Sequence, residues 1–137
     1  MMLEVMLRIT RGPSLDAGVI VDLNSRAPIY LTGPPSLGSP TATVSNGVVE
    51  WSNRTLSLPL AIYGLDSAVM TAAIGSVARA LSSGEPTWIM FRRSEHDAVS
   101  WFRIIAPVEG ALDFKHVRPD REENAYLWDL RLVAETH

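Results

Sequence analysis

Residues 54–63 read Arg-Thr-Leu-Ser-Leu-Pro-Leu-Ala-Ile-Tyr, and the rest of the chain is organised around them. Large aliphatic residues stand at every second position, at Leu56, Leu58, Leu60 and Ile62. That period is typical of a strand with one buried face. Pro59 lies on the opposite phase and has no amide hydrogen to donate, so we expect the strand to be bulged or to lie at a sheet edge.

A single amphipathic helix follows, over about residues 66–83. Asp66 or Ser67 can cap its N-terminus, and Ser82-Ser83-Gly84 ends it. Apolar residues recur at helical spacing, at Met70, Ala73, Ile74, Val77 and Leu81. The opposite face is made of small residues, at Ala68, Ala72, Gly75 and Ser76. Arg79 is the only charged residue on this face. A solvent-facing side normally carries more charge, so we expect this helix to be covered on both faces.

Short strands precede and follow the helix. Upstream, apolar alternation predicts strands over 3–9, 18–23 and 28–31, and Asn46-Gly47 predicts a hairpin of 41–45 with 48–52. The proline-rich segment 32–40 predicts a loop. Downstream, strands are predicted over 87–91, 98–105 and 125–134. A charged turn at 92–97 separates the first two, and 107–124 is expected to be an exposed loop or a long hairpin tip.

Together these segments predict a mainly β fold, either a β-sandwich or a partly closed barrel, flanked by one α-helix. A length of 137 residues corresponds to about one domain, so we expect residues 1–137 to form a single unit. The first strand contains no proline, so we expect it to offer an unprotected sheet edge.

The composition excludes several classes of function. Twelve basic and fifteen acidic residues give a net charge of -3, which argues against a protein that grips DNA through its phosphates. Cysteine is absent, which excludes disulfides and thiol chemistry. No run of about 18 apolar residues occurs, so we expect a chain made in the cytoplasm and no membrane segment.

Residues suited to catalysis or metal binding are few. Glu95, His96 and Asp97 could offer two carboxylates and an imidazole, but successive residues of an extended chain point to opposite faces. A solvated turn is therefore favoured over a metal site or a hydrolase site. His116 and His137 lie in a charged segment and at the C-terminus. We expect no enzyme activity, no metal and no cofactor.

Four tryptophans leave a second function open. Trp51, Trp88, Trp101 and Trp128 all lie on predicted strands, where packing in a core or an interface is the favoured role. The alternative is an aromatic platform. In that case the protein would be a monomeric barrel or sandwich that binds a small molecule or a carbohydrate.

The order of the parts resembles a known family. The strand Arg-Thr-Leu-Ser-Leu-Pro-Leu-Ala-Ile-Tyr-Gly over 54–64 leads into the helix. The strand 87–91, a tryptophan-containing strand with Arg103, and a long strand ending in Leu-Arg-Leu-Val-Ala at 130–134 follow. This order is similar to the ring-forming domain of phage distal tail proteins, and more broadly to the tail-tube family. The resemblance implies a homomeric, hexameric ring around the DNA channel at the tail tip, with no chemistry of its own.

The same resemblance implies a place in the virion tail. The partners would be copies of this chain, other tail proteins such as the tail tube and the baseplate hub, and DNA in transient, non-specific passage. Many distal tail proteins carry a second, C-terminal domain for receptor contact, and 137 residues leave no room for it. We therefore expect a structural role rather than direct host binding.

Two groups of residues are expected to make contacts in such an assembly. The predicted self-assembly interface takes residues from the first strand, the proline-rich loop and the small-residue helix face: Glu4, Met6, Arg8, Pro34, Pro35, Leu37, Ala72, Gly75, Ser76 and Arg79. An acidic loop facing the channel or a neighbouring ring is expected from Glu109, Asp113, Asp120, Glu122 and Glu123.

Overall fold

A computed structural model describes residues 4–25, 28–113 and 117–135. The elements, in chain order, are β1 (Met6–Thr10), β2 (Val19–Asp22), β3 (Ile29–Leu31), β4 (Ala42–Ser45), β5 (Val48–Trp51), β6 (Arg54–Tyr63), α1 (Ser67–Leu81), β7 (Trp88–Arg92), β8 (Ser100–Pro107), β9 (Val117–Asp120) and β10 (Ala125–Ala134). The prediction of a mainly β fold with one helix is confirmed for this part of the chain.

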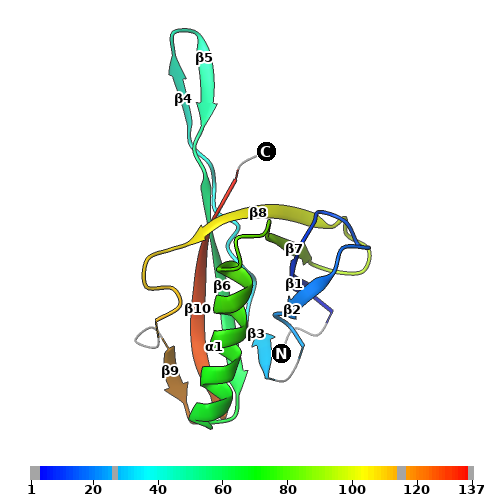
Figure 1. The fold of residues 1–137 in the computed structure, drawn as a ribbon, viewed down its shortest axis with the longest axis vertical. Coiled ribbons are helices and arrows are strands. Elements are labelled where there is room, and N and C mark those ends of the chain that lie inside the picture. The colour runs from blue at the N-terminus through cyan, green and yellow to red at the C-terminus, as the bar shows by residue number, and fades with distance from the viewer. Residues whose placement is uncertain (1–3, 26–27, 114–116, 136–137) are drawn as a thin grey trace.

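The strands form one large sheet and one separate hairpin. The large sheet runs in the order β2-β1-β7-β8-β10-β6-β3, with β9 also paired to β10, and it curls into a nearly closed barrel. Figure 1 shows α1 lying along the long β6 and β10 strands, with the shorter β1, β2 and β7 running across one side. The β4–β5 hairpin stands apart and projects from one end of the molecule.

The antiparallel pair of β6 and β10 is the centre of the barrel. The two strands pair from Tyr63↔Ala125 to Arg54↔Ala134. Because side chains alternate across a strand, this register puts one row of each strand into the core. The fully buried members of the two rows are Leu56, Leu58, Leu60, Ile62, Trp128, Leu130, Leu132 and Ala134. The alternation predicted for both strands is confirmed.

Pro59 lies in an interior strand, so the expected edge position is wrong. β6 pairs with β10 on one side and with β3 on the other. The Pro59 carbonyl accepts a hydrogen bond from the Thr32 amide at 2.9 Å, which places its backbone polar groups on the β3 side. β3 ends at Leu31, so the missing amide hydrogen of Pro59 faces the position where the neighbouring strand has just finished. The sheet therefore accommodates the proline without a broken ladder.

The expectation of a free edge at the first strand is also wrong. β1 pairs with β2 through Arg8↔Asp22 and with β7 through Met6↔Arg92. Both sides of the strand are therefore occupied within the chain. Leu3, expected at its start, lies outside the described residues.

The two ends of the sheet are joined by one side chain. The Asn24 amide nitrogen donates to the carbonyl of Val5 at 2.6 Å, and its oxygen accepts from the amide of Leu31 at 3.0 Å. Val5 immediately precedes the β1 region, whereas Leu31 is on β3 at the other end of the strand order. Asn24 thereby bridges the gap at which the barrel does not close through strand pairing.

The helix agrees closely with its predicted position. The Asp66 side chain accepts from the Ala68 amide at 2.8 Å, so Asp66 is the N-cap of a helix that runs from Ser67 to Leu81. The buried side is made of Ala73, Ile74, Val77 and Ala80. In the described part of the chain, no helix has the length and apolarity needed to cross a membrane.

The segment 107–124 contains a strand that the sequence did not single out. β9 pairs with the first half of β10, from Trp128↔Val117 to Ala125↔Asp120, while β8 pairs with the second half. β10 extends beyond the residues that pair with β8, so its first half pairs with a second strand, β9. The hairpin-tip interpretation therefore holds for residues 117–124, and 108–113 is a loop.

Candidate assembly surfaces

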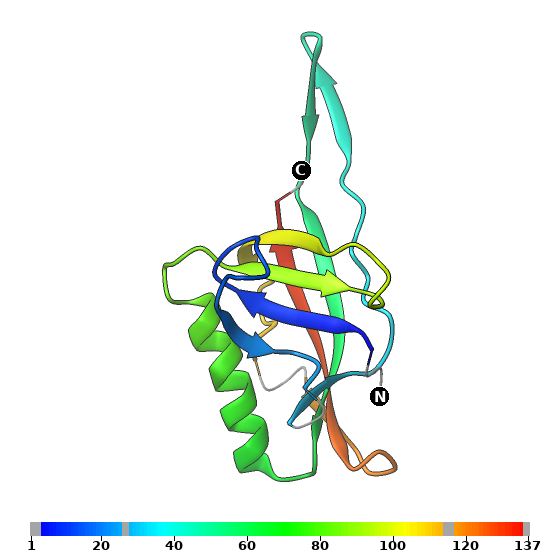
Figure 2. The ribbon, with the colours of Figure 1, turned by 90° about the vertical axis from the view of Figure 1, so that its right-hand side faces the viewer.

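The most exposed feature of the molecule is the β4–β5 hairpin with its two legs, residues 41–53, which we call the arm. Every residue of the arm is exposed. Figure 2 shows it extending well beyond the barrel, along the longest axis of the molecule. Asn46 and Gly47 at its tip have φ angles of 52° and 78°, the left-handed values that a two-residue hairpin turn requires. The predicted hairpin is confirmed.

The register of the arm separates its side chains into two unlike faces. The cross-strand pairs Ala42↔Trp51 and Val44↔Val49 place only apolar side chains on one face. The other two pairs, Thr43↔Glu50 and Ser45↔Val48, make a mainly polar opposite face. On the apolar face Val44 is 72% exposed, Val49 52% and Trp51 60%. The arm is thus an amphipathic ribbon whose apolar face is left exposed by the described residues.

The two legs of the arm are joined to each other at its base. The Ser52 amide donates to the Thr41 carbonyl and the Thr41 amide donates to the Ser52 hydroxyl, both at 2.8 Å. In the loop that precedes the arm, Ser36 forms an isolated bridge with Ser57 of β6, so this loop is held against the barrel.

A second apolar surface lies at the opposite end of the molecule, where β6 turns into α1 (Figure 2). It consists of Tyr63, Leu65 and Val69, which are 51%, 39% and 37% exposed. We call these three residues the basal patch. Asp66 lies among them in sequence, and its carboxylate is occupied by the Ala68 amide. Short-range sequence patterns give no sign of this surface, because the three residues belong to three different local structures.

The helix residues predicted for self-assembly lie together. Ala72 and Arg79 are exposed, and Gly75 and Ser76 are half-buried. The Arg79 guanidinium bonds the Ser76 hydroxyl at 3.3 Å. A shallow hollow of about 280 Å³ adjoins them, with Arg11 and Val21 on its other side. Among the described residues this face stays partly exposed, and its coverage by a neighbouring subunit stays a prediction.

The other predicted interface residues are partly engaged within the chain. Glu4 is exposed, but the Met6 sulfur accepts from Arg92 at 2.7 Å and Arg8 pairs with Asp22 at 3.6 Å. In the proline-rich loop Pro34 is exposed and Pro35 is half-buried. Leu37 packs against the main core. The residues predicted for self-assembly therefore belong to three different segments, namely the first strand, the proline-rich loop and the helix.

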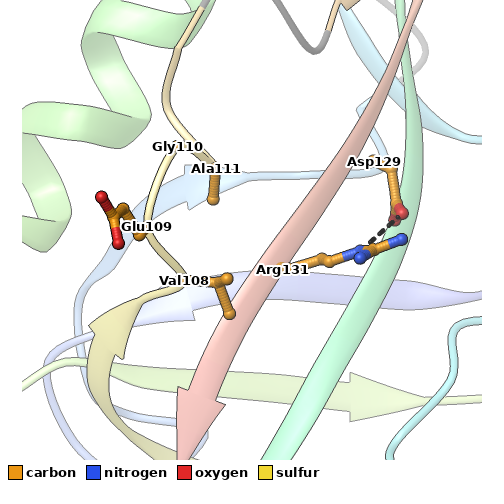
Figure 3. A pocket seen from close by; sticks show the side chains of 6 residues that line it. All are labelled: Val108, Glu109, Gly110, Ala111, Asp129 and Arg131. Atoms are coloured by element: carbon orange, nitrogen blue, oxygen red, sulfur yellow. Dashed lines mark hydrogen bonds and ion pairs between the residues drawn. The ribbon is translucent and has the colours of Figure 1, made fainter.

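The predicted acidic loop is divided between two places. Glu109 and Asp113 belong to the loop after β8, whereas the other three residues, Asp120, Glu122 and Glu123, form the β9–β10 turn. Glu109 borders a hollow of about 290 Å³ whose wall includes the ion pair of Asp129 and Arg131, at 3.0 Å. Figure 3 shows the Glu109 carboxylate turned away from that pair.

The β9–β10 turn changes the electrostatics of one buried side chain. The Asp120 carboxylate accepts from the amides of Glu122 and Glu123 at 3.1 and 3.4 Å and so fixes the turn. Burial raises the pKa of the Tyr30 phenol above its usual value, and the negative charges of Glu123 and Asp120 raise that pKa further. Tyr30 is therefore a neutral hydroxyl over the physiological range.

The turn between β7 and β8 contains the residues considered for catalysis. Glu95 and His96 are exposed, and the Asp97 carboxylate is held by Arg93 at 3.3 Å and by the Ser94 hydroxyl at 3.2 Å. Among the described residues no group of three or more His, Asp or Glu side chains is placed to hold a metal ion. The predicted turn between the two strands is present, and Glu95 and His96 are exposed in it. His116 and His137 lie outside the described residues.

The four tryptophans do not form one platform. Trp128 is buried in the core, where its indole N–H donates to the Ala111 carbonyl at 3.0 Å. Trp88 and Trp101 are half-buried on β7 and β8, and Trp51 is on the arm. Trp128 therefore packs in the core, Trp88 and Trp101 pack partly buried in the sheet, and Trp51 lies on the surface.

Comparison with known proteins agrees with the fold. No family model and no curated protein match the chain. A chain in a solved structure of the phage p2 baseplate in its activated conformation with Sr is similar over 96% of this chain, with a TM-score of 0.52 and 12% identity. A chain in the corresponding baseplate structure with Ca has a TM-score of 0.49 and 11% identity over the same share. This protein spans 43% of the length of either chain. The fold of this chain is therefore similar to that of part of a chain in the phage p2 baseplate.

Proposed function

We propose that this protein is a structural component of a phage tail, of the distal-tail or tail-tube class, which assembles into a homomeric ring around the DNA channel. The observation that carries the proposal is the uncovered apolar face of the arm. The partners are copies of this chain and neighbouring tail proteins such as the tail tube and the baseplate hub. Its place is the virion tail, after synthesis in the host cytoplasm.

An isolated two-stranded hairpin is only marginally stable in water. Its free strand edges and its exposed apolar side chains, including Val44 and Trp51, also favour association with another chain. A protein that stayed monomeric would gain nothing from this feature. An assembling protein buries the apolar face and orders the hairpin in the same step, so the arm is best explained as a contact between chains.

The likeness to a phage baseplate chain supports the class of assembly, because the shared fold covers nearly the whole of this chain. The sixfold symmetry follows from the resemblance to distal tail proteins.

The proposal predicts that the protein assembles and that the arm is required. Light scattering coupled to size exclusion, with negative-stain imaging, should find closed rings at high protein concentration. Replacing residues 42–51 by a short Gly-Ser linker should leave a folded monomer with unchanged thermal unfolding. A wild-type protein that stays monomeric at high concentration, with no rings in any tail preparation, would contradict the proposal.

A further inference from the structure

We infer that the occupant of the apolar arm face is the basal patch of a second copy, so that subunits join head to tail. This inference rests on the proposed homomeric assembly and adds to it the two surfaces that meet. One surface is the arm face of Ala42, Val44, Val49 and Trp51, and the other is Tyr63, Leu65 and Val69.

The exposed area of the chain is the first argument. A compact monomer of 15.0 kDa exposes about 7,000 Å². This chain exposes 7963 Å², an excess of about 900 Å² over that value. A stable interface of standard size buries about 800 Å² on each partner. The excess over a compact chain is therefore about as large as the surface that one such interface removes from each partner.

The second argument is that the chain has a complementary surface of its own. The basal patch is apolar, and the nearest charge in sequence, Asp66, is already bonded to a helix amide. The apolar arm face carries no charge, and the single charge of the hairpin strands, Glu50, is on its other face. In space, the exposed carboxylates of Glu122 and Glu123 belong to the adjoining β9–β10 turn, because Tyr63 pairs with Ala125 and the Gly64 amide donates to the Asn124 carbonyl. These two carboxylates would remain in water at the rim of the contact, while its centre buries apolar groups.

The third argument is the position of the two surfaces. The arm leaves the barrel at one end of the longest axis, and the turn from β6 into α1 lies at the other (Figures 1 and 2). Two arms packed face to face would leave the basal patch of each copy uncovered. Arm-to-patch contact covers both surfaces on every interior subunit. Such a heterologous contact closes into a ring or continues as a stack, depending on the rotation between subunits.

Two variants, each defective on one surface, test the inference. The arm variant is Val44→Thr with Trp51→Ser, and the patch variant is Leu65→Ser with Val69→Ser. Each variant alone should lose assembly, with association weakened more than about tenfold, because truncation of a central tryptophan is among the most damaging interface changes. Mixed in equal amounts, they should form a heterodimer and nothing larger, since only one intact arm and one intact patch remain to meet.

Matched controls keep the result specific. Val48→Thr changes an exposed valine on the polar face of the same arm, and Leu15→Ser changes a leucine that is 66% exposed in the β1–β2 connection. Both controls should assemble as the wild type does. Thermal unfolding of the two double variants should match the wild type, which shows that the loss of assembly is not a loss of folding.

The outcomes separate the inference from the proposed function. Wild-type rings together with a mixture that stays monomeric would overturn arm-to-patch docking and leave the homomeric ring standing. A wild type that never self-associates would overturn both. Wild-type rings, two monomeric variants and a heterodimer in the mixture would establish the head-to-tail contact.

Discussion

At the scale of single residues, the Asn24 side chain connects two distant parts of the sheet. It bridges the Val5 carbonyl and the Leu31 amide across the gap between the two ends of the sheet. No strand pair performs this function, because β2 and β3 are separated by a turn and do not pair with each other. One carboxamide supplies both the donor and the acceptor that are needed.

Replacing Asn24 with alanine should therefore lower the free energy of unfolding by about 2–3 kcal/mol, since two backbone groups of low exposure lose their partner. Urea unfolding monitored by tryptophan fluorescence measures the change. Asn53→Ala, at an exposed asparagine at the base of the arm, is the matched control and should change stability by less than about 0.5 kcal/mol. Equal losses for both variants would show that Asn24 has no special role in closing the barrel.

At the scale of elements, a glycine lets the loop before the arm pass close to β6. Gly38 has a φ of +66°, and a Cβ at this position would collide with the backbone carbonyl of Thr55 on β6. Gly47 at the arm tip has a similar φ of +78°, but a Cβ there would meet open space. Both glycines need a positive φ, but only Gly38 has neighbouring atoms where a Cβ would lie. Substituting each with alanine therefore distinguishes the cost of backbone strain from the cost of a steric clash.

Gly47→Ala should cost about 1–2 kcal/mol from left-handed strain alone, and the loss should be confined to the arm. Hydrogen exchange should accordingly be faster in β4 and β5 and unchanged in β6 and β10. Gly38→Ala should cost more, because the loop before the arm must move away from β6, and it should lower the global midpoint of urea unfolding. If Gly38→Ala were the milder of the two, the close approach to Thr55 would not be a constraint on the fold.

Charge acts at the scale of the whole molecule. In the proposed ring, a net charge of -3 per subunit would give the wall no general attraction for phosphate, which would suit a channel through which DNA passes. The exposed carboxylates at Glu109, Glu122 and Glu123 contribute to that charge without fixing a turn or a core contact of their own.

Changing these three glutamates to lysine should convert the protein into a DNA-binding one. Each reversal adds two charges, so the net charge rises from -3 to about +3. Gel-shift titration should show no complex of wild-type rings with duplex DNA at about 150 mM salt, and a salt-sensitive complex for the triple variant. Retention of DNA by the wild type at that salt concentration would contradict a non-binding channel wall.

The sequence by itself determined the local structure of this protein. The alternation at Leu56–Ile62 and at Trp128–Leu132, the Asp66 cap and the Asn46-Gly47 turn each depend on a few neighbouring residues, so their patterns predict them directly. The candidate sites were less predictable. The apolar arm face could have been found by writing out the hairpin register, which pairs Val44 with Val49 and Ala42 with Trp51.

Only the tertiary structure decided which strands are neighbours and which surfaces remain uncovered. β1 reads as an edge strand and is an interior one, and Pro59 is tolerated inside the sheet because β3 stops beside it. The basal patch exists because a strand end, a turn and a helix start meet at one end of the barrel. Strand order and exposure depend on contacts between residues far apart in the chain, and local periodicity carries no information about those contacts.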